Sequence, residues 1–501
     1  MSTNDSILTV ELESTELASR GVELAEMPVF AIAGEDALSR LFEIKASVVY
    51  RDPNAEPFDV AAFLEAEIAV VFRRDGVEVR RIHGLVREVR DRMNPTDMQP
   101  YVVYDFVIVP RLWHLDCVVS FDVFLDKTVP EILQAKLENL GFSEGIDFEF
   151  RLLGSYPKRE FVMQFRESDL AFVMRLVEHV GIAFYFDHAS GADKLVFTDD
   201  STAFRSVSGS PLPFNLTGKT TDVYALERSV THMPEIAYCI DYDYRQPSLE
   251  LSVSHQVSAT PAGGVIDYGS NFTTIAEGEA LVRARVEERQ VATDLYLGTA
   301  DTQTLFAGGL VAIHGHTRHV PTLLVTRVVF EGRQPAKGAS TESEPGHFAV
   351  RFEAIPATRQ FRPARVTPKP RIFGVLPAVI ETDDIGTIEA TPLIDSFGRY
   401  RVHFKFDAEA SSARHGSHWV RLAQPLSGPG YGWSFPIRRG VEVMVAFEDG
   451  DPDRPVIVGA VYNGHAPNPV TATNSLKSRL VSQSGVLFEI DDGVAASAHE
   501  E

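Results

Sequence analysis

The chain has 501 residues, with 47 Lys and Arg against 70 Asp and Glu, so its formal net charge is −23. At roughly 150 residues per domain, this length predicts about three domains. Its 44% hydrophobic and 23% charged residues are typical of a folded protein rather than a disordered one. So acidic a surface repels phosphate backbones and anionic headgroups, which disfavours nucleic acid as a main partner.

The N-terminus is polar and acidic, and no basic region leads into an apolar run, so no signal peptide is predicted. No apolar run approaches the roughly 18–20 residues of a membrane span. Any export is therefore expected to need a dedicated machine. Cys117 and Cys239 predict two buried thiols in a reducing compartment rather than a disulfide framework.

Short runs of alternating apolar residues dominate the first part of the chain. Examples lie at residues 42–46, 67–72 and 101–109. Their spacing and the turn residues between them favour sandwich or barrel sheets over βαβ units.

Three segments show helical spacing between start and stop signals: residues 128–141, 168–181 and 274–291. A capping box opens the first at Thr128 and Glu131, and another opens the third at Thr274 and Glu277. Asp169 in the first turn of the second suits the helix dipole. The apolar face of the third is weaker, so we expect it to be partly exposed.

Prolines and basic residues interrupt regular structure between residues 360 and 377; the prolines are Pro363, Pro368, Pro370 and Pro377. This composition predicts a semi-extended linker. Alternating or continuous apolar runs then follow at residues 400–406, 441–447 and 455–461, with turns at 395–398 and 448–452. About five strands in fewer than 100 residues favour a small OB-like barrel.

The last 39 residues, 463–501, have a different pattern. Pro467 and Pro469 break the barrel, and Val486, Phe488 and Ile490 then alternate in a single strand. One such strand cannot bury both faces, so it needs partners from this chain or from copies of it. The final residues, 495–501, are small and charged and are expected to fray.

Two long motifs resemble the VgrG family, the valine–glycine repeat spike proteins of type VI secretion. The first comprises residues 164–173 (QFRESDLAFV) and 181–186 (GIAFYF). The second runs through the barrel segments: residues 395–402 (DSFGRYRV), 419–425 (WVRLAQP), 430–432 (GYG) and 440–455 (GVEVMVAFEDGDPDRP). The resemblance extends from about residue 20 to 490.

The resemblance implies a mainly β fold with a few short helices. Residues 1–370 would form a hub of two barrel-like subdomains, with helical insertions near 128–181 and 274–291. Residues 373–462 would form the OB-like barrel, and 463–501 the start of a trimeric β-helix needle.

The implied function is structural: a membrane-puncturing homotrimer at the tip of a type VI secretion tube. Three hubs would present six similar barrels to the hexameric Hcp tube. Baseplate components, a PAAR-repeat tip protein, adaptors and effectors would be further partners, and the target membrane would be touched transiently. The protein would assemble in the cytoplasm and then be exported without a signal peptide. It would not be an enzyme.

The sequence departs from the family after Tyr462, because no long valine–glycine repeat follows. The seat for a PAAR tip, and whether the chain is trimmed, therefore stay open. Three alternatives also remain: the spike of a phage tail or extracellular contractile particle, a cell-wall hydrolase on this scaffold, and an OB-type nucleic-acid binder.

Two clusters of potential metal ligands favour structural interpretations. His314, His316 and His319 lack a Cys or carboxylate at tetrahedral spacing, so we expect exposed strand histidines. Residues 449–453 carry three aspartates, Asp449, Asp451 and Asp453, as in a calcium loop. Ala460 stands where that loop needs its glutamate, so a turn is expected instead.

Catalytic, metal-binding and cofactor-binding residues are not predicted. Ser427 lies in a Gly-Pro loop without the context of a nucleophile elbow, and no phosphate-binding loop motif occurs. Trp419 and Trp433 resemble ligand-stacking residues of OB barrels, but packing in the barrel core or at an interface is the favoured interpretation.

Overall fold

The computed structural model describes residues 8–51, 59–92, 101–216, 222–257, 262–337, 339, 341, 346–382, 388–389, 391–407 and 416–493. The fold is mainly β with a few helices, as the sequence predicts. It divides into two compact units. The first contains residues 1–118, 133–157 and 169–368, and the second contains residues 119–132, 158–168 and 369–501.

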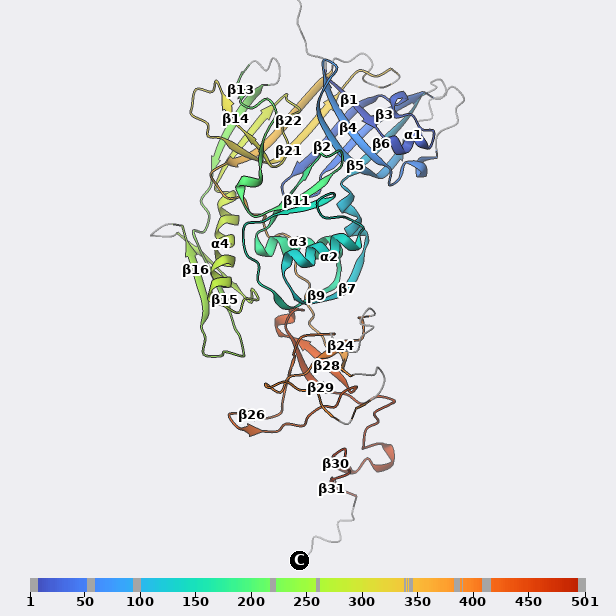
Figure 1. Cartoon of the computed structure of the whole chain (residues 1–501), viewed down its shortest axis with the longest axis vertical. Helices are drawn as coiled ribbons and strands as arrows, with labels where there is room; N and C mark the ends of the chain where they lie inside the picture. The colour runs from blue at the N-terminus through green and yellow to red at the C-terminus, as the bar shows by residue number, and fades with distance from the viewer. Residues whose placement is uncertain are drawn as a thin grey trace, which may run out of the picture. The chain divides into compact units, whose positions relative to one another are not determined.

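One large sheet of twelve strands dominates the first unit (Figure 1). Its order is β1 (Leu8–Glu13), β4 (Glu67–Arg74), β5 (Val77–Asp91), β6 (Tyr101–Val109), β3 (Glu43–Arg51), β2 (Val29–Ala37), β21 (Leu323–Arg333), β22 (His347–Pro356), β18 (Asp294–Ala300) and β14 (Val223–Val230), with β19 (Gly309–Val311) on β21 and β12 (Arg205–Ser206) on β19. The strands predicted at 67–72 and 101–109 are β4 and β6, and the run at 42–46 leads into β3.

Strands β2 and β21 join an N-terminal half of this sheet to a half from residues 205–356. They pair antiparallel, with Ala31 opposite Arg333 and Ala37 opposite Arg327. Where the halves meet, Gly34 of β2 lies opposite Phe330 of β21, and within the second half Gly298 of β18 lies opposite Phe352 of β22. A Cβ atom at either glycine would overlap the phenyl ring beside it. In both pairings the glycine therefore lets an aromatic ring approach a neighbouring strand closely.

Smaller elements complete the first unit. These are α1 (Thr15–Ser19), the sheet of β10 (Ala183–Asp187), β11 (Lys194–Thr198) and β8 (Phe148–Arg151), the pair β13 (Leu212–Pro213) and β20 (Ile313–His314), and the sheet of β16 (Leu251–Gln256), β15 (Ile236–Asp241) and β17 (Gly264–Tyr268). Short 3-10 helices lie at Leu24–Glu26, Val60–Phe63, Arg111–Cys117 and Ser201–Ala203, and in the second unit at Glu448–Gly450 and Ala472–Asn474.

The three predicted helices are α2 (Val129–Asn139), α3 (Asp169–Val180) and α4 (Ile275–Val291). The capping box of α2 is complete: Thr128 N donates to Glu131 Oε2 at 2.7 Å, and Glu131 N to Thr128 Oγ1 at 3.2 Å. In α4, Glu277 N donates to Thr274 Oγ1 at 3.3 Å. The carboxylate of Glu277, however, accepts from Thr273 N, so the reciprocal bond lies one residue earlier than predicted.

Helix α4 lies against β15 and β16 (Figure 1). Val282 and Val286 on the helix are buried with Cys239 of β15 and Val253 of β16, whereas Arg283 is exposed. The predicted partial exposure of this helix is thus confirmed. None of the helices in the described part of the chain is long and apolar enough to span a membrane.

The second unit centres on a five-stranded sheet. Its order is β24 (Val402–Phe404), β23 (Leu376–Ile380), β28 (Glu442–Phe447), β29 (Pro455–Ala460) and β25 (Arg421–Leu422). Pro377, predicted in the linker, is the second residue of β23. A proline is tolerated near the start of a strand because few ladder bonds there need its missing N–H.

Two further strands differ from the predicted domain bounds. Strands β7 (Val119–Lys127) and β9 (Arg159–Ser168), expected within the hub, group with the barrel in the second unit. Phe161, Met163 and Phe165 of β9 are buried in one cluster with barrel side chains. Met163 N also donates to Asp453 Oδ1 at 2.7 Å. The local sequence pattern did not identify the core that β9 joins.

Candidate assembly surface

The C-terminal segment forms a two-stranded hairpin. Strand β30 (Lys477–Val481) pairs antiparallel with β31 (Leu487–Asp491), and Val481 lies opposite Leu487. Gly485 closes the turn at φ +88°, where glycine is favoured. The sequence predicted β31 but missed β30; Ser482 and Gly485, a turn signal just before β31, could have pointed to it.

Large apolar side chains on this hairpin are exposed on both faces. Phe488 is 64% exposed and Ile490 50%, and Leu480, Val481 and Leu487 are also exposed. An isolated two-stranded hairpin is at best marginally stable in water. Exposed apolar side chains gathered in this way are typical of interaction surfaces.

Charged pairs fix the register of the hairpin. Glu489 accepts from Lys477 Nζ at 2.8 Å and from Arg479 Nε at 2.7 Å, and Lys477 also pairs with Asp491 at 3.2 Å. The hydrogen bond from Lys477, with that from Arg479, lowers the pKa of Glu489. The cations lie on β30 and the acids on β31, so the opposite charges favour this one pairing.

A second exposed apolar group lies on a short arm of the barrel unit, made by β26 (Ser427–Gly428) and β27 (Tyr431–Gly432). Tyr431, Phe435 and Leu426 are exposed, and Trp433 is 62% exposed. A barrel-core position for Trp433 is therefore wrong, and an interface position stays a prediction. Trp419 is half-buried, with the guanidinium of Arg401 4.9 Å from its ring centroid.

The histidine cluster is divided by a turn. Strand β20 ends at His314, and Gly315 adopts φ +81°. His316 accepts from Arg318 N at 3.0 Å and lies edge-on to Phe214. Within the described ranges, no three His, Cys, Asp or Glu side chains are grouped as metal ligands.

The three aspartates predicted to form a turn are bound by cations of the linker. Lys369 Nζ lies 2.5 Å from Asp451 Oδ1 and 2.7 Å from Asp453 Oδ2. Arg371 Nη1 lies 2.9 Å from Asp449 Oδ2. The side-chain cations thus occupy the carboxylates that a calcium ion would need. Sequence spacing did not reveal these partners, because they lie about 80 residues earlier in the chain.

The two cysteines differ in environment. Cys239 is buried beneath α4, and its burial raises the pKa of the thiol. Cys117 is exposed at the end of a 3-10 helix, so the prediction of two buried thiols is wrong for it. A short 3-10 helix shields few of its own side chains from solvent. The sequence pattern does not show which face of such a helix stays exposed.

The described residues thus form a β-rich first unit and a small barrel unit followed by a hairpin with exposed apolar side chains. A family model described as phage tail baseplate hub (GPD) matches residues 35–336. A second, described as type VI secretion system/phage-baseplate injector OB domain, matches residues 385–462. The chain belongs to the phage tail baseplate hub family, and the predicted resemblance to VgrG proteins is confirmed.

Individual relatives agree with this assignment. The type VI secretion system spike protein VgrG4b of Pseudomonas aeruginosa is 30% identical over 463 residues, covering 89% of this chain and 55% of the relative. The chain thus spans little more than half the length of that relative.

Solved structures share the fold. The E. coli c3393 protein, described as a component of the type VI secretion system with similarity to the T4 tail proteins gp27 and gp5, aligns with a TM-score of 0.63 at 23% identity, over 91% of this chain and 100% of that chain. A Francisella PdpA–VgrG complex, half-lidded, aligns with a TM-score of 0.61 at 9% identity, over 98% of this chain and 84% of that chain.

Proposed function

We propose that the chain is a structural, membrane-puncturing spike subunit of a type VI secretion machine and that it works as a homotrimer. The exposed apolar hairpin of β30 and β31 carries this proposal. When the hairpins of three copies wind about one axis, each hairpin buries its apolar side chains against the other two. The strands then pair between chains, so no strand edge is left unpaired. Rigidity then comes from association rather than from a core within one chain.

The hub unit supports docking on a hexameric tube. Its large sheet has an N-terminal half and a half from residues 205–356, so three chains would present six halves. This symmetry suits the Hcp tube and the baseplate around it. PAAR-repeat tips, adaptors and effectors are further proposed partners. The solved Francisella PdpA–VgrG complex, which shares this fold, supports binding of other proteins in general.

The proposed role is mechanical rather than enzymatic. Contraction of a sheath supplies the work, and the spike supplies a stiff, narrow point that touches the target membrane briefly. We further propose that the protein assembles in the cytoplasm before it is exported. The hub of a phage tail is the second candidate, because the family model that matches residues 35–336 is described by that role. Isolating the native particle, as a secretion apparatus or as a virion, separates the two.

Light scattering on the purified full-length chain tests the trimer. We expect a mass three times the 55.4 kDa of one chain. A chain ending at residue 470, which lacks the hairpin but keeps the barrel, is the matched control and should lose the trimer. A monomer of 55.4 kDa at micromolar concentration for the full chain would contradict the proposal.

A further inference from the structure

The linker after β22 pairs its basic side chains with acids of the first unit. Three arginines between residues 359 and 365 take part. The ion pairs are Arg359–Asp294 at 3.8 Å, Arg362–Glu287 at 2.7 Å and Arg365–Asp267 at 2.8 Å. Opposite charges therefore hold this stretch, although its prolines prevent a regular element.

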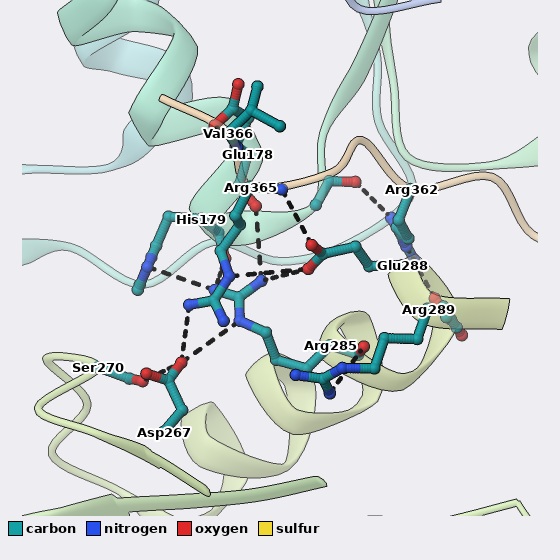
Figure 2. A network of polar contacts seen from close by, with 12 residues as sticks. Glu178, His179, Asp267, Ser270, Arg285, Glu288, Arg289, Arg362, Arg365 and Val366 are labelled. Atoms are coloured by element: carbon teal, nitrogen blue, oxygen red, sulfur yellow. Dashed lines mark hydrogen bonds and ion pairs between the residues drawn. The ribbon is translucent and has the colours of Figure 1, made fainter. Parts of the chain in front are cut away.

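Hydrogen bonds from the backbone of the linker also hold it at the C-terminal end of α3. The carboxylate of Glu178 is buried and accepts from Val366 N at 3.0 Å, from Thr367 N at 2.8 Å and from Thr367 Oγ1 at 2.8 Å. Arg362 Nη1 donates to the carbonyl of Gly181 at 2.8 Å. The linker thus crosses the C-terminal end of α3, where its cation also suits the helix dipole (Figure 2).

Arg285 of α4 makes further hydrogen bonds and ion pairs in the same network. It is 1% exposed, and its Nη2 donates to the carbonyl of His179 at 2.6 Å. It also faces Asp267 at 3.6 Å and Glu288 at 3.7 Å, the acids that Arg365 contacts at 2.8 and 3.7 Å. Figure 2 shows the two guanidinium groups side by side between these carboxylates.

The charge of Arg285 persists at neutral pH. Burial, with the nearby charge of Arg365, lowers the pKa of Arg285 to about 10. Two arginines thus share two partly exposed carboxylates, and of the four groups only Arg285 is buried.

We propose that residues 359–367 are an ionic strap that locks the linker onto α3 and α4, with Arg285 as a buried positioning residue. Thr367 is the last anchor in the first unit, and Lys369, bound to Asp451 and Asp453, is the first in the second. Pro368 alone separates them. Any use of the strap in transmitting force rests on the proposed function, but the strap itself does not.

Trypsin offers a direct readout of the strap. It cleaves after Arg and Lys but not before proline, so Arg362 and Lys369 resist it. The Arg365–Val366 bond reports on the strap, and the Arg371–Ile372 bond serves as reference in the second unit. In the native full-length protein, we expect slow cleavage at Arg365–Val366.

Two sets of variants test the strap. Glu178→Gln keeps the shape of the side chain but removes its charge, and we expect cleavage at Arg365–Val366 to accelerate by about tenfold or more, because the rate follows local opening. Glu287→Arg should act likewise, because it places a second cation against Arg362. Glu88→Gln, whose partner Arg90 is an exposed surface residue, is the matched control and should change nothing.

Two results would overturn the strap: native cleavage at Arg365–Val366 as fast as in the unfolded chain, or unchanged rates in both acidic-residue variants. If Glu178→Gln fails to fold, Glu287→Arg at the half-buried Glu287 still decides. Cleavage at Arg371–Ile372 should stay constant throughout. Light scattering on the same samples reports the trimer separately, so failure of the strap and of the proposed function are distinguishable.

Discussion

Strands β28 and β31 carry the same alternation of apolar side chains but differ in how those side chains are covered. In β28, Val443 and Val445 are fully buried. In β31, Phe488 is 64% exposed and Ile490 is 50% exposed. Local pattern alone gives no reason for the difference.

The difference comes from neighbours. Strand β28 lies between β23 and β29, and the face with Val443 shares a core with β9. In the described part of the chain, β31 pairs with β30 alone. Alternation therefore predicts a strand with one apolar face. It does not show whether the element that packs on this face belongs to the same chain or to another. Within the described residues, the hairpin leaves its large apolar side chains exposed.

Truncating the barrel core should have the largest effect. Phe404 of β24 is fully buried and stacks with Phe406 and Phe447. Phe404→Ala should lower the free energy of unfolding of the second unit by about 3–5 kcal/mol, because it leaves a cavity. Urea denaturation followed by tryptophan fluorescence measures this. If Phe488→Ala in a monomeric chain lowers the free energy of unfolding by the same amount, the two regions do not differ in how their apolar side chains are buried.

Polar substitutions on the hairpin should weaken association and leave the barrel intact. Burying one Phe or Ile contributes about 1.5–3 kcal/mol, so Phe488→Ser with Ile490→Ser should raise the dissociation constant of the trimer at least about a hundredfold. Light scattering across a dilution series measures it. Leu153→Ser, at an exposed apolar residue of the first unit, is the control. Retention of the trimer in the double variant would mean that the hairpin is not the assembly surface.

The smallest effect concerns pH. The pKa of Glu489 is lowered by the hydrogen bond from Lys477 and by Arg479. Its contribution to hairpin pairing is therefore complete above the ordinary pKa of a glutamate and is lost as the pH falls through the lowered value. NMR titration should find a low pKa that returns toward the ordinary value in Lys477→Ala. An unchanged pKa in that variant would show that the cross-strand pair does not set the register.

The sequence by itself determined the local features. These features depend on hydrogen bonds or on alternation within a few residues, so the sequence shows them directly. Examples are the capping box of Thr128 and Glu131, strand β6 and the barrel strands. The family motifs also lie in continuous segments, which is why the hub and the barrel could be expected from the order of the residues alone.

Only the tertiary structure decided which distant residues meet. It placed β9 in the barrel core, Lys369 between Asp451 and Asp453, and Arg285 beneath the linker. It also left Cys117 exposed. Burial and ion pairing depend on the packing of segments far apart in the chain. A periodic pattern in one segment carries no information about which other segment packs against it.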